Sequence, residues 1–547
     1  MITELRIGNF KAFGETQRVP IKPITLIFGA NSSGKSSILH ALLYFQHAES
    51  KSEFRLHADG VFNTTWTASA PSLDIHQTKL GGSLVDLGGF AAFVHKRIHT
   101  EYVSLGIDFD LKHPLAKDVL ELVRTGDWGP KENVLARNNS LGVNMKIGYA
   151  PLKGTVLWPK FEGDARVMVE KTLDDFCLTA RRLAVQECEV QVDSTWALRF
   201  ERFGDAYMGL APANPEHAWV AERLMREDGD LTKSDQAAEV MAVAPFLPEW
   251  ISHKPGVFHF GRRDDADEAL ASLCSDLRAL TSEFCQKISY LGGMRILPPR
   301  HLPSADTNDA NWASSGMEAW HRLLDDAGLV EAVNTWLADP AKLSSPYRLV
   351  VKELVDAASL EKQFDLLSAS AVGGGEQTVF KAALQHSLRS GEHREVGLWD
   401  MRNSTAVSHR DVGLGISQIL PVLVNALSAK SEMVCIEQPE LHLHPALQAQ
   451  LGDVFIESAL GERKNTFLLE THSEHLILRI MRRIRETTKG ALPPGIPAIR
   501  PDDVAVLFVE ATPNGSVVRE MKLNERGEFV KAWPGGFFEE GAREILT

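Results

Sequence analysis

The residues from Gly29 to Ser37 have the types and spacing needed to hold phosphate groups and a magnesium ion. Two glycines, Gly29 and Gly34, flank four residues and are followed by Lys and Ser, which is the Walker A pattern. In such a loop, backbone N–H groups and the positive end of the following helix cradle phosphates, Lys35 reaches the outer phosphates, and the Ser36 hydroxyl ligates magnesium. We expect the nucleotide to be held by Asn31, Ser32, Ser33, Gly34, Lys35, Ser36 and Ser37.

A second chemically suggestive segment lies far downstream, where the apolar run 433–436 ends in Glu437-Gln438-Pro439-Glu440. An acidic residue at the end of a buried strand beside a phosphate-binding loop is the Walker B arrangement, and it holds magnesium, usually through water. We therefore expect Ser36 and Glu437 to be the magnesium ligands.

Two more segments carry polar residues at element ends. The apolar run 466–470 leads into His472, which could reach the terminal phosphate or the attacking water. Before both runs, Gly413, Gly415, Ser417 and Gln418 open an apolar helix, and glycine with serine at a helix start forms an anion site. A surface acid, a helix-start histidine and a plain helix cap would explain each segment alone. Their order favours an ATP-binding head.

Local patterns place these residues on elements. A strand over 24–28 and a helix over 37–43 flank the phosphate loop, and residues 2–27 read as short antiparallel strands. Leucines at helical spacing predict a helix over 265–290. We expect an α/β fold: a split P-loop ATPase head with a mixed sheet and an inserted α+β and helical domain. The expected parts are a first lobe (1–100), an inserted α+β domain (101–264), a helical part (265–375), a second lobe (376–495) and a closing strand segment (496–547).

Composition limits the class of protein. A net charge of −14 argues against non-specific nucleic-acid binding over the whole surface, although a local basic groove is compatible with it. The five cysteines are scattered, which favours a reducing cytoplasm over a disulfide or zinc framework. The N-terminal residues do not read as a signal peptide, and no apolar stretch is long enough to cross a bilayer, so we expect a cytoplasmic protein without membrane contact.

The motifs together resemble those of the ABC-type ATPases related to SMC, RecF and OLD proteins. The run from Asn9 to Phe13 looks like their "NFKxF" opening, Ile436 to Pro445 like their "EEPExHLHP" segment, and Glu470 to Ser473 like their "THS" switch. Two glycine-containing stretches, Tyr290 to Arg295 and Trp533 to Phe538, are similar to bacterial members. Some of these members serve in anti-phage systems such as Septu, PARIS and Gabija.

This resemblance implies ATP and Mg²⁺ as cofactors and a homodimer or higher even oligomer closed by ATP, with Lys35 of one copy facing Ser417 of the other. OLD-type proteins carry a Toprim nuclease after the head, but too few residues follow His472 here for that domain. The resemblance therefore implies an ATPase that acts as sensor and scaffold for a separate effector, a nuclease or toxin, in anti-phage defence. The alternative is a DNA-maintenance ATPase that binds nucleic acid directly when ATP closes the dimer.

The chain departs from the family pattern at Gln438, where such heads usually carry the glutamate that activates water. An amide cannot accept a proton at neutral pH. Three explanations stay open: slow or gated hydrolysis, which we favour; Glu440 as the base; or a substitution introduced to trap nucleotide. Glu437, Gln438, Glu440 and His472 are thus the candidate catalytic residues.

Two groups of residues have competing interpretations. His442 and His444 alternate as a metal pair would, but their place in the partner-contacting loop is the stronger interpretation. Four arginines after the histidine switch could contact DNA, RNA or an acidic partner, or form an ordinary solvated helix face: Arg479, Arg482, Arg483 and Arg485. Asp502 and Asp503 read as a turn before a strand.

Overall fold

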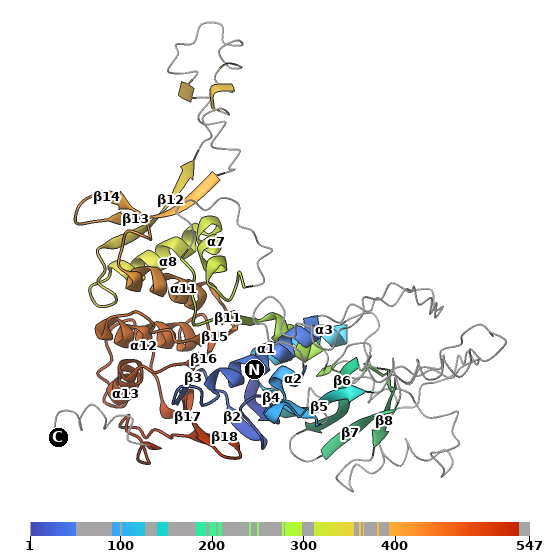
Figure 1. The fold of residues 1–547 in the computed structure, drawn as a ribbon. Helices are drawn as coiled ribbons and strands as arrows, with labels where there is room; N and C mark the ends of the chain where they lie inside the picture. Colours follow the sequence, from blue (N-terminus) through green and yellow to red (C-terminus); the bar gives the residue numbers. More distant parts are fainter. Residues whose placement is uncertain are drawn as a thin grey trace, which may run out of the picture. The chain divides into compact units, whose positions relative to one another are not determined.

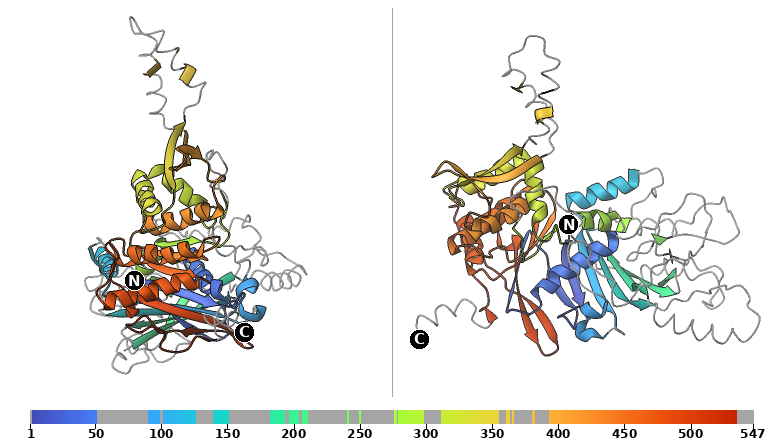
Figure 2. Two further views of the ribbon diagram at one scale, coloured as in Figure 1. Left: turned by 90° about the vertical axis from the view of Figure 1, so that its left-hand side faces the viewer. Right: turned by 45° about the horizontal axis from the view of Figure 1, so that its top comes forward.

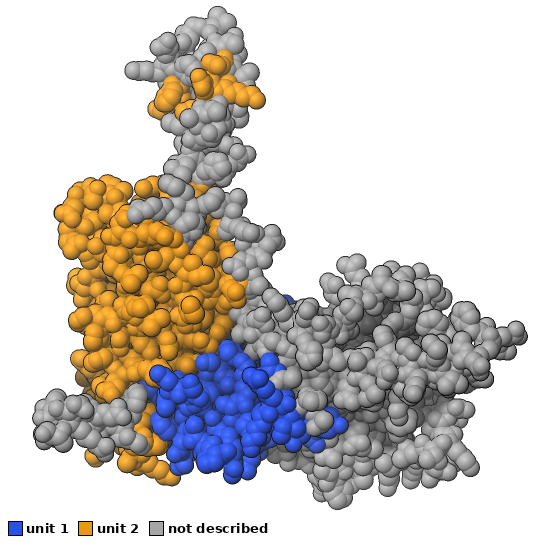
Figure 3. Space-filling model, viewed as in Figure 1, with its two compact units in different colours: residues 1–288, 505–521 blue, residues 289–504, 522–547 orange. Residues whose placement is uncertain are grey.

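The computed structural model describes residues 2–50, 90–98, 101–125, 139–150, 182–192, 196–203, 206–210, 240–241, 249–250, 276–277, 279–297, 311–354, 360–362, 365, 380–381 and 393–534. These residues form two compact units (Figure 3). Unit 1 comprises residues 1–288 and 505–521, and unit 2 comprises residues 289–504 and 522–547. The five-part division expected from the sequence stays a prediction, as does the inserted domain.

Unit 1 is built on a nine-stranded antiparallel sheet in the order β10-β9-β8-β7-β6-β5-β4-β1-β2 (Figure 1). Its strands are β1 (Ile2–Gly8), β2 (Gln17–Pro20), β4 (Val103–Asp110), β5 (Ser140–Ala150), β6 (Arg182–Val192), β7 (Trp196–Phe203), β8 (Ala206–Leu210), β9 (Val240–Met241) and β10 (Glu249–Trp250). The expected antiparallel strands near the N-terminus are confirmed. Because Leu5 pairs with Ile107, strands from the expected insertion continue the sheet that the N-terminus begins.

Further elements of unit 1 carry the phosphate loop. Strand β3 (Ile24–Gly29) is buried along its whole length and lies beside β17 (Val504–Thr512), which pairs antiparallel with β18 (Gly515–Glu520). Helix α1 (Lys35–Ser50) follows the loop, and α2 (Phe90–Phe93), η1 (His95–Arg97) and α3 (Pro114–Thr125) complete the unit. The strand and helix expected around the phosphate loop are both confirmed.

Unit 2 contains parallel and antiparallel pairing, with β11 (Ile288–Leu291) beside β15 (Met433–Glu437), and β15 parallel to β16 (Thr466–Glu470). Unit 2 also contains three helices, which are drawn in orange to red in Figures 1 and 2: α11 (Leu414–Ser428), α12 (Pro445–Leu460) and α13 (Glu474–Thr488). The mixed α/β class is therefore confirmed. The helix expected over 265–290 is described at 276–277 and 279–286, and the chain becomes strand at Ile288. Leu270 and Leu273 lie outside the described residues.

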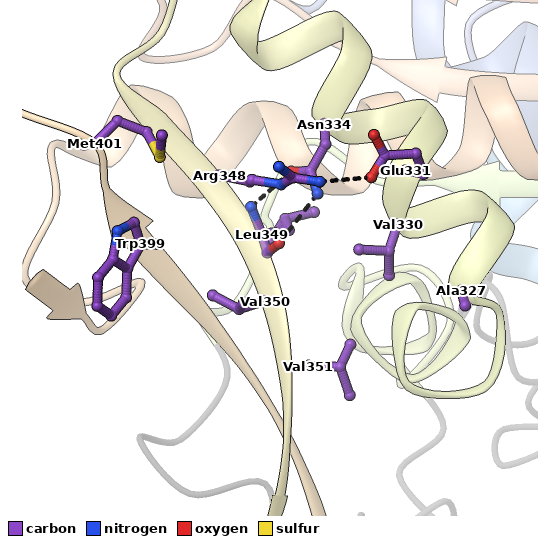
Figure 4. A pocket seen from close by; sticks show the side chains of 10 residues that line it. All are labelled: Ala327, Val330, Glu331, Asn334, Arg348, Leu349, Val350, Val351, Trp399 and Met401. Atoms are coloured by element: carbon purple, nitrogen blue, oxygen red, sulfur yellow. Dashed lines mark hydrogen bonds and ion pairs between the residues drawn. The ribbon is translucent and has the colours of Figure 1, made fainter. Parts of the chain in front are cut away.

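A second sheet in unit 2 has the order β12-β13-β14, with bounds Tyr347–Leu354, His393–Asp400 and Thr405–Val407. Helices α7 (Met317–Asp325) and α8 (Ala327–Ala338) pack against it. Asn334 of α8 accepts from Leu349 N at 2.7 Å and donates to Leu349 O at 3.0 Å, so a side chain pairs with the outer edge of β12 (Figure 4). A pocket lies here, lined largely by aliphatic side chains and crossed by the Arg348–Glu331 ion pair.

The arginines of α13 hold two helices of unit 2 together. Asp453 of α12 is 3% exposed and accepts from Arg483 Nε at 2.7 Å and from Arg479 Nη1 at 2.6 Å. Arg482 stays exposed and pairs with Glu486 on its own helix. From the sequence, nucleic acid, an acidic partner or solvent could face these arginines. For Arg479 and Arg483 the structure shows a carboxylate on a neighbouring helix of the same chain.

We expect Asp453→Ala to lower the free energy of unfolding by about 3–5 kcal/mol, because Arg479 loses its carboxylate partner and the buried Arg483 charge keeps only Glu486. The matched control is Glu331→Ala, which breaks an ion pair whose side chains are 65% and 52% exposed and should cost at most about 1 kcal/mol. Urea unfolding of the full chain, followed by tryptophan fluorescence, measures both. Equal costs would contradict the assignment.

Candidate nucleotide and magnesium site residues

The phosphate loop in unit 1 has a backbone that its two glycines make feasible. Gly29 has φ +149° and Gly34 has φ +99°, both in a region that side chains rarely adopt. A Cβ on Gly29 would lie 2.4 Å from Val509 O, and one on Gly34 would lie 2.5 Å from the Cβ of Ala12. The two glycines of the Walker A pattern are therefore required by both conformation and space.

The start of β18 holds the backbone of the phosphate loop by hydrogen bonds. Ser516 Oγ donates to Ser33 O at 2.6 Å, and Ser516 N donates to Ala12 O at 2.7 Å. One residue thus joins the phosphate loop to the chain after β1, although it lies near the opposite end of the sequence. We did not expect this role from the sequence, because a serine after a turn glycine carries no specific signal.

The side chains of the loop suit a phosphate with its magnesium ion. Lys35 is 4% exposed, and its Nζ donates to Ala30 O at 2.9 Å, so the ammonium group is held against the loop itself. Ser33 Oγ is buried and has no hydrogen bond to any described residue. Residues 30–32 are exposed and Ser36 lies in the first turn of α1. The assignment of residues 31–37 to nucleotide binding stays a prediction, with which this geometry is compatible.

The acidic segment of unit 2 turns sharply at the end of β15. Glu437 is opposite Glu470 in the parallel ladder, and Gln438 N donates to Glu470 O at 2.7 Å. Gln438 adopts φ +44°, a strained conformation for a residue with a side chain. The turn leaves Glu437 and Gln438 half-buried while Glu440 is buried. The predicted strand before Glu437 is confirmed.

Tyr290 is a residue of this site whose role the sequence did not reveal. Its hydroxyl donates to Glu437 Oε1 at 2.9 Å. Burial, and then the charge of Glu437, raises the pKa of Tyr290, so the hydroxyl stays protonated and remains a donor. Gly293 also lies close to this carboxylate, since a Cβ at that position would be 3.6 Å from Glu437 Oε2. In the sequence, the available signal for this role was Tyr290 ahead of the paired glycines Gly292 and Gly293.

Glu440 uses both carboxylate oxygens on the loop after β16. Oε1 accepts from His472 N at 2.7 Å, and Oε2 accepts from Thr471 Oγ1 at 2.8 Å. The residue is 8% exposed, and burial raises its pKa while these donors act in the opposite direction. This geometry favours a positioning role for Glu440 over the role of base that the sequence left open.

The loop that carries His472 is fixed at its far side as well. Ser473 Oγ caps α13 by accepting from Leu476 N at 3.1 Å, and it donates to Gln448 Oε1 at 2.7 Å. His472 is half-buried between Glu440 and this cap. Its backbone is thus held by hydrogen bonds on both sides, which is what a residue that must present a ring at a fixed place needs.

The glycine segment before α11 differs from its expected use. Ser417 is 2% exposed and its hydroxyl donates to the carbonyl oxygen of His409, while Gln418 is 6% exposed. Both side chains therefore face the interior of unit 2. At the helix start itself, Gly413 and Leu414 are exposed. If this segment binds an anion, its backbone must do so rather than Ser417 or Gln418.

The two histidines beside the acidic turn have separate places. His444 caps α12, its Nδ1 accepting from Ala446 N at 3.3 Å, and His442 has φ +63°. Among the described residues no group of three or more His, Cys, Asp or Glu side chains could hold a metal ion. Asp502 and Asp503 lie in a 3₁₀ turn directly before β17, as predicted.

None of the described helices is long and apolar enough to cross a membrane. Three family models match parts of the chain. Residues 1–123 match "AAA ATPase domain", and residues 309–479 match "AAA domain, putative AbiEii toxin, Type IV TA system". Residues 499–546 match a protein family of unknown function. No curated protein matches the chain.

Solved SMC head domains are similar at low identity. A head bound to the C-terminal winged-helix domain of ScpA has 11% identity and a TM-score of 0.38, covering 95% of this chain and 98% of that one. A head with an extended coiled coil, bound to the C-terminal domain of ScpA derived from Pyrococcus furiosus, has 11% identity and a TM-score of 0.34, with coverage of 100% and 98%. The head domain from Thermotoga maritima has 9% identity and a TM-score of 0.30, with coverage of 95% and 99%. The matches over 1–123 and 309–479 make these two segments similar to AAA ATPase domains, which supports an ATPase.

Proposed function

We propose that the chain is a slowly hydrolysing, ATP-gated switch that dimerises through ATP and controls a separate effector, a nuclease or toxin, in anti-phage defence. The observation that carries the ATP-binding part is the Walker A loop, with Lys35 buried against it and glycines at the two positions that demand them. We assign magnesium to Ser36 and Glu437. When bound, magnesium would neutralise charge that develops on the phosphates.

Two features support slow turnover. Gln438 occupies the position where a carboxylate would accept a proton from water, and an amide cannot do so. Glu440, the alternative acid, has both oxygens engaged by the loop after β16. ATP would then serve as a long-lived clamp, which suits a switch better than a motor.

The description of the family model over 309–479 names a putative toxin of a toxin–antitoxin system, and it supports the defence setting. The burial of Arg483 and its pairing with Asp453 remove one candidate nucleic-acid contact of the alternative function. Oligomerisation, the effector and a cytoplasmic location are parts of the proposal. Salt-dependent binding of DNA by the purified chain alone would instead support a DNA-maintenance ATPase.

Lys35→Met should weaken ATP binding by roughly 10- to 100-fold, because it removes a charge-assisted hydrogen bond to the phosphates. Titration with a fluorescent ATP analogue in the presence of Mg²⁺ measures the affinity. Lys22→Met is the matched control, since Lys22 lies before β3 and pairs with Glu520 at 3.8 Å. Unchanged affinity in Lys35→Met would exclude this loop as the nucleotide site.

Gln438→Glu should raise kcat for ATP by roughly tenfold or more, because it supplies a general base. Glu440→Gln should lower kcat, and so should Thr471→Val, which keeps the side-chain shape but removes the donor to Glu440. Steady-state phosphate release measures all three. A base at Glu440 predicts another pattern: no turnover in Glu440→Gln, and normal turnover in both Thr471→Val and Gln438→Glu.

Addition of ATP and Mg²⁺ should convert the purified chain to a dimer or higher even oligomer. The mass of the Lys35→Met variant should not change on the same addition. Light scattering coupled to size-exclusion chromatography gives the mass directly. The dimer should persist longer than in Gln438→Glu, whose faster hydrolysis shortens the clamped state. A chain that stays monomeric with ATP and Mg²⁺ would refute the gated-dimer part of the proposal.

A further inference from the structure

Arg295 is a buried cation behind the acidic turn of unit 2. The residue is only 8% exposed, and its Nη2 donates to Glu437 O and to Gln438 O, both at 2.8 Å. The guanidinium group therefore clamps the two peptide carbonyls on either side of the strained turn. A single nitrogen thus bridges the two carbonyls, and the positive charge of the guanidinium group strengthens both hydrogen bonds.

The charge of Arg295 is also matched to this place. Burial lowers its pKa to about 10, and the nearby carboxylates of Glu440 and Glu437 act in the opposite direction. Arg295 thus stays protonated at neutral pH and offsets the two acidic residues. A divalent cation arriving at Glu437 would change this balance, so Arg295 is placed to respond to it.

The same residue is linked to the start of α11. Gln418 Nε2 donates to Arg295 O at 3.4 Å, close to the limit for a hydrogen bond, and Arg410 Nη2 donates to Leu297 O at 3.1 Å. Residues 295–297 therefore connect the acidic turn with the glycine segment before α11. This connection lies wholly within unit 2.

Three buried atoms at this connection have no hydrogen bond to any residue that the structure describes: Arg295 Nε, Arg295 Nη1 and Gln418 Oε1. Two are donors and one is an acceptor, and they belong to residues that already touch. Leaving buried polar groups unsatisfied is unfavourable. A second arrangement, in which Arg295 donates to Gln418 Oε1, would satisfy one donor and the acceptor together.

We propose that Arg295 is a positioning residue that couples the magnesium ligand Glu437 to the start of α11 through Gln418. A shift of the Glu437 and Gln438 carbonyls on magnesium binding moves the guanidinium group, which then gains or loses Gln418 Oε1. The exposed start of α11 at Gly413 then moves as well, because Gln418 lies less than two turns away on the same helix. This proposal rests on the proposed function, since it needs magnesium and nucleotide to act on unit 2.

The test measures the Mg²⁺ concentration that half-saturates binding of a fluorescent, non-hydrolysable ATP analogue to the full chain. Arg295→Lys keeps the charge but loses the planar guanidinium group with its Nε and Nη1 donors, and it should raise that concentration by about tenfold, the size of one charge-assisted hydrogen bond. Nucleotide affinity measured in excess EDTA should stay within about twofold, which a general loss of structure would not allow. Arg322→Lys is the matched control: Arg322 bonds to Glu318 and Ser428 in the same unit and should leave both values unchanged.

Gln418→Leu should raise the half-saturating Mg²⁺ concentration less, by about threefold. The half-saturating Mg²⁺ concentration of the double variant should be no higher than that of Arg295→Lys alone, because Gln418 acts through Arg295. Additive effects, or normal Mg²⁺ dependence in either single variant, would overturn the coupling. If Arg295→Lys does not fold, as judged by circular dichroism, Gln418→Leu decides alone. Absence of Mg²⁺-dependent nucleotide binding in the unsubstituted chain would overturn the proposed function itself, and the coupling with it.

Discussion

Sharp backbone reversals at the ends of buried strands are the constraint on which both functional segments depend. A chain leaving a buried strand must turn within a few residues while every buried N–H and C=O keeps a partner. After β3 the turn is made by Gly29, Ser32 and Gly34 in unusual conformations. After β15 it is made by Gln438, whose N–H bonds to Glu470 O and whose carbonyl bonds to Arg295.

These reversals explain why remote residues support each segment. In the phosphate loop, the Ser33 carbonyl accepts from the hydroxyl of Ser516. The acidic turn draws on Arg295 in the same way. In both cases the supporting residue holds the backbone, and the functional side chains of Lys35 and Glu437 are held in place indirectly. Such outer support is how binding groups acquire a fixed geometry.

The acidic residues of unit 2 divide the work according to their environment. Glu437 is half-buried and receives one tyrosine hydroxyl, which leaves it suited to a metal ion. Glu440, three residues on, is buried and spends both oxygens on the loop that presents His472. Gln438 between them carries no charge, so the turn avoids three adjacent carboxylates. The slow turnover that we propose would then be a consequence of this arrangement rather than a defect in it.

The sequence alone was sufficient for the parts whose physics is local. Glycine spacing, an apolar run and a following lysine determined the strand, loop and helix of the phosphate site, and apolar runs determined β15 and β16. Only the tertiary structure decided how Ser516, Tyr290 and Arg295 serve these segments, since their partners lie far away in the chain and side-chain type does not encode distance. It also turned Ser417 inward and paired Arg483 with Asp453, because which helix face is buried depends on the neighbours that cover it.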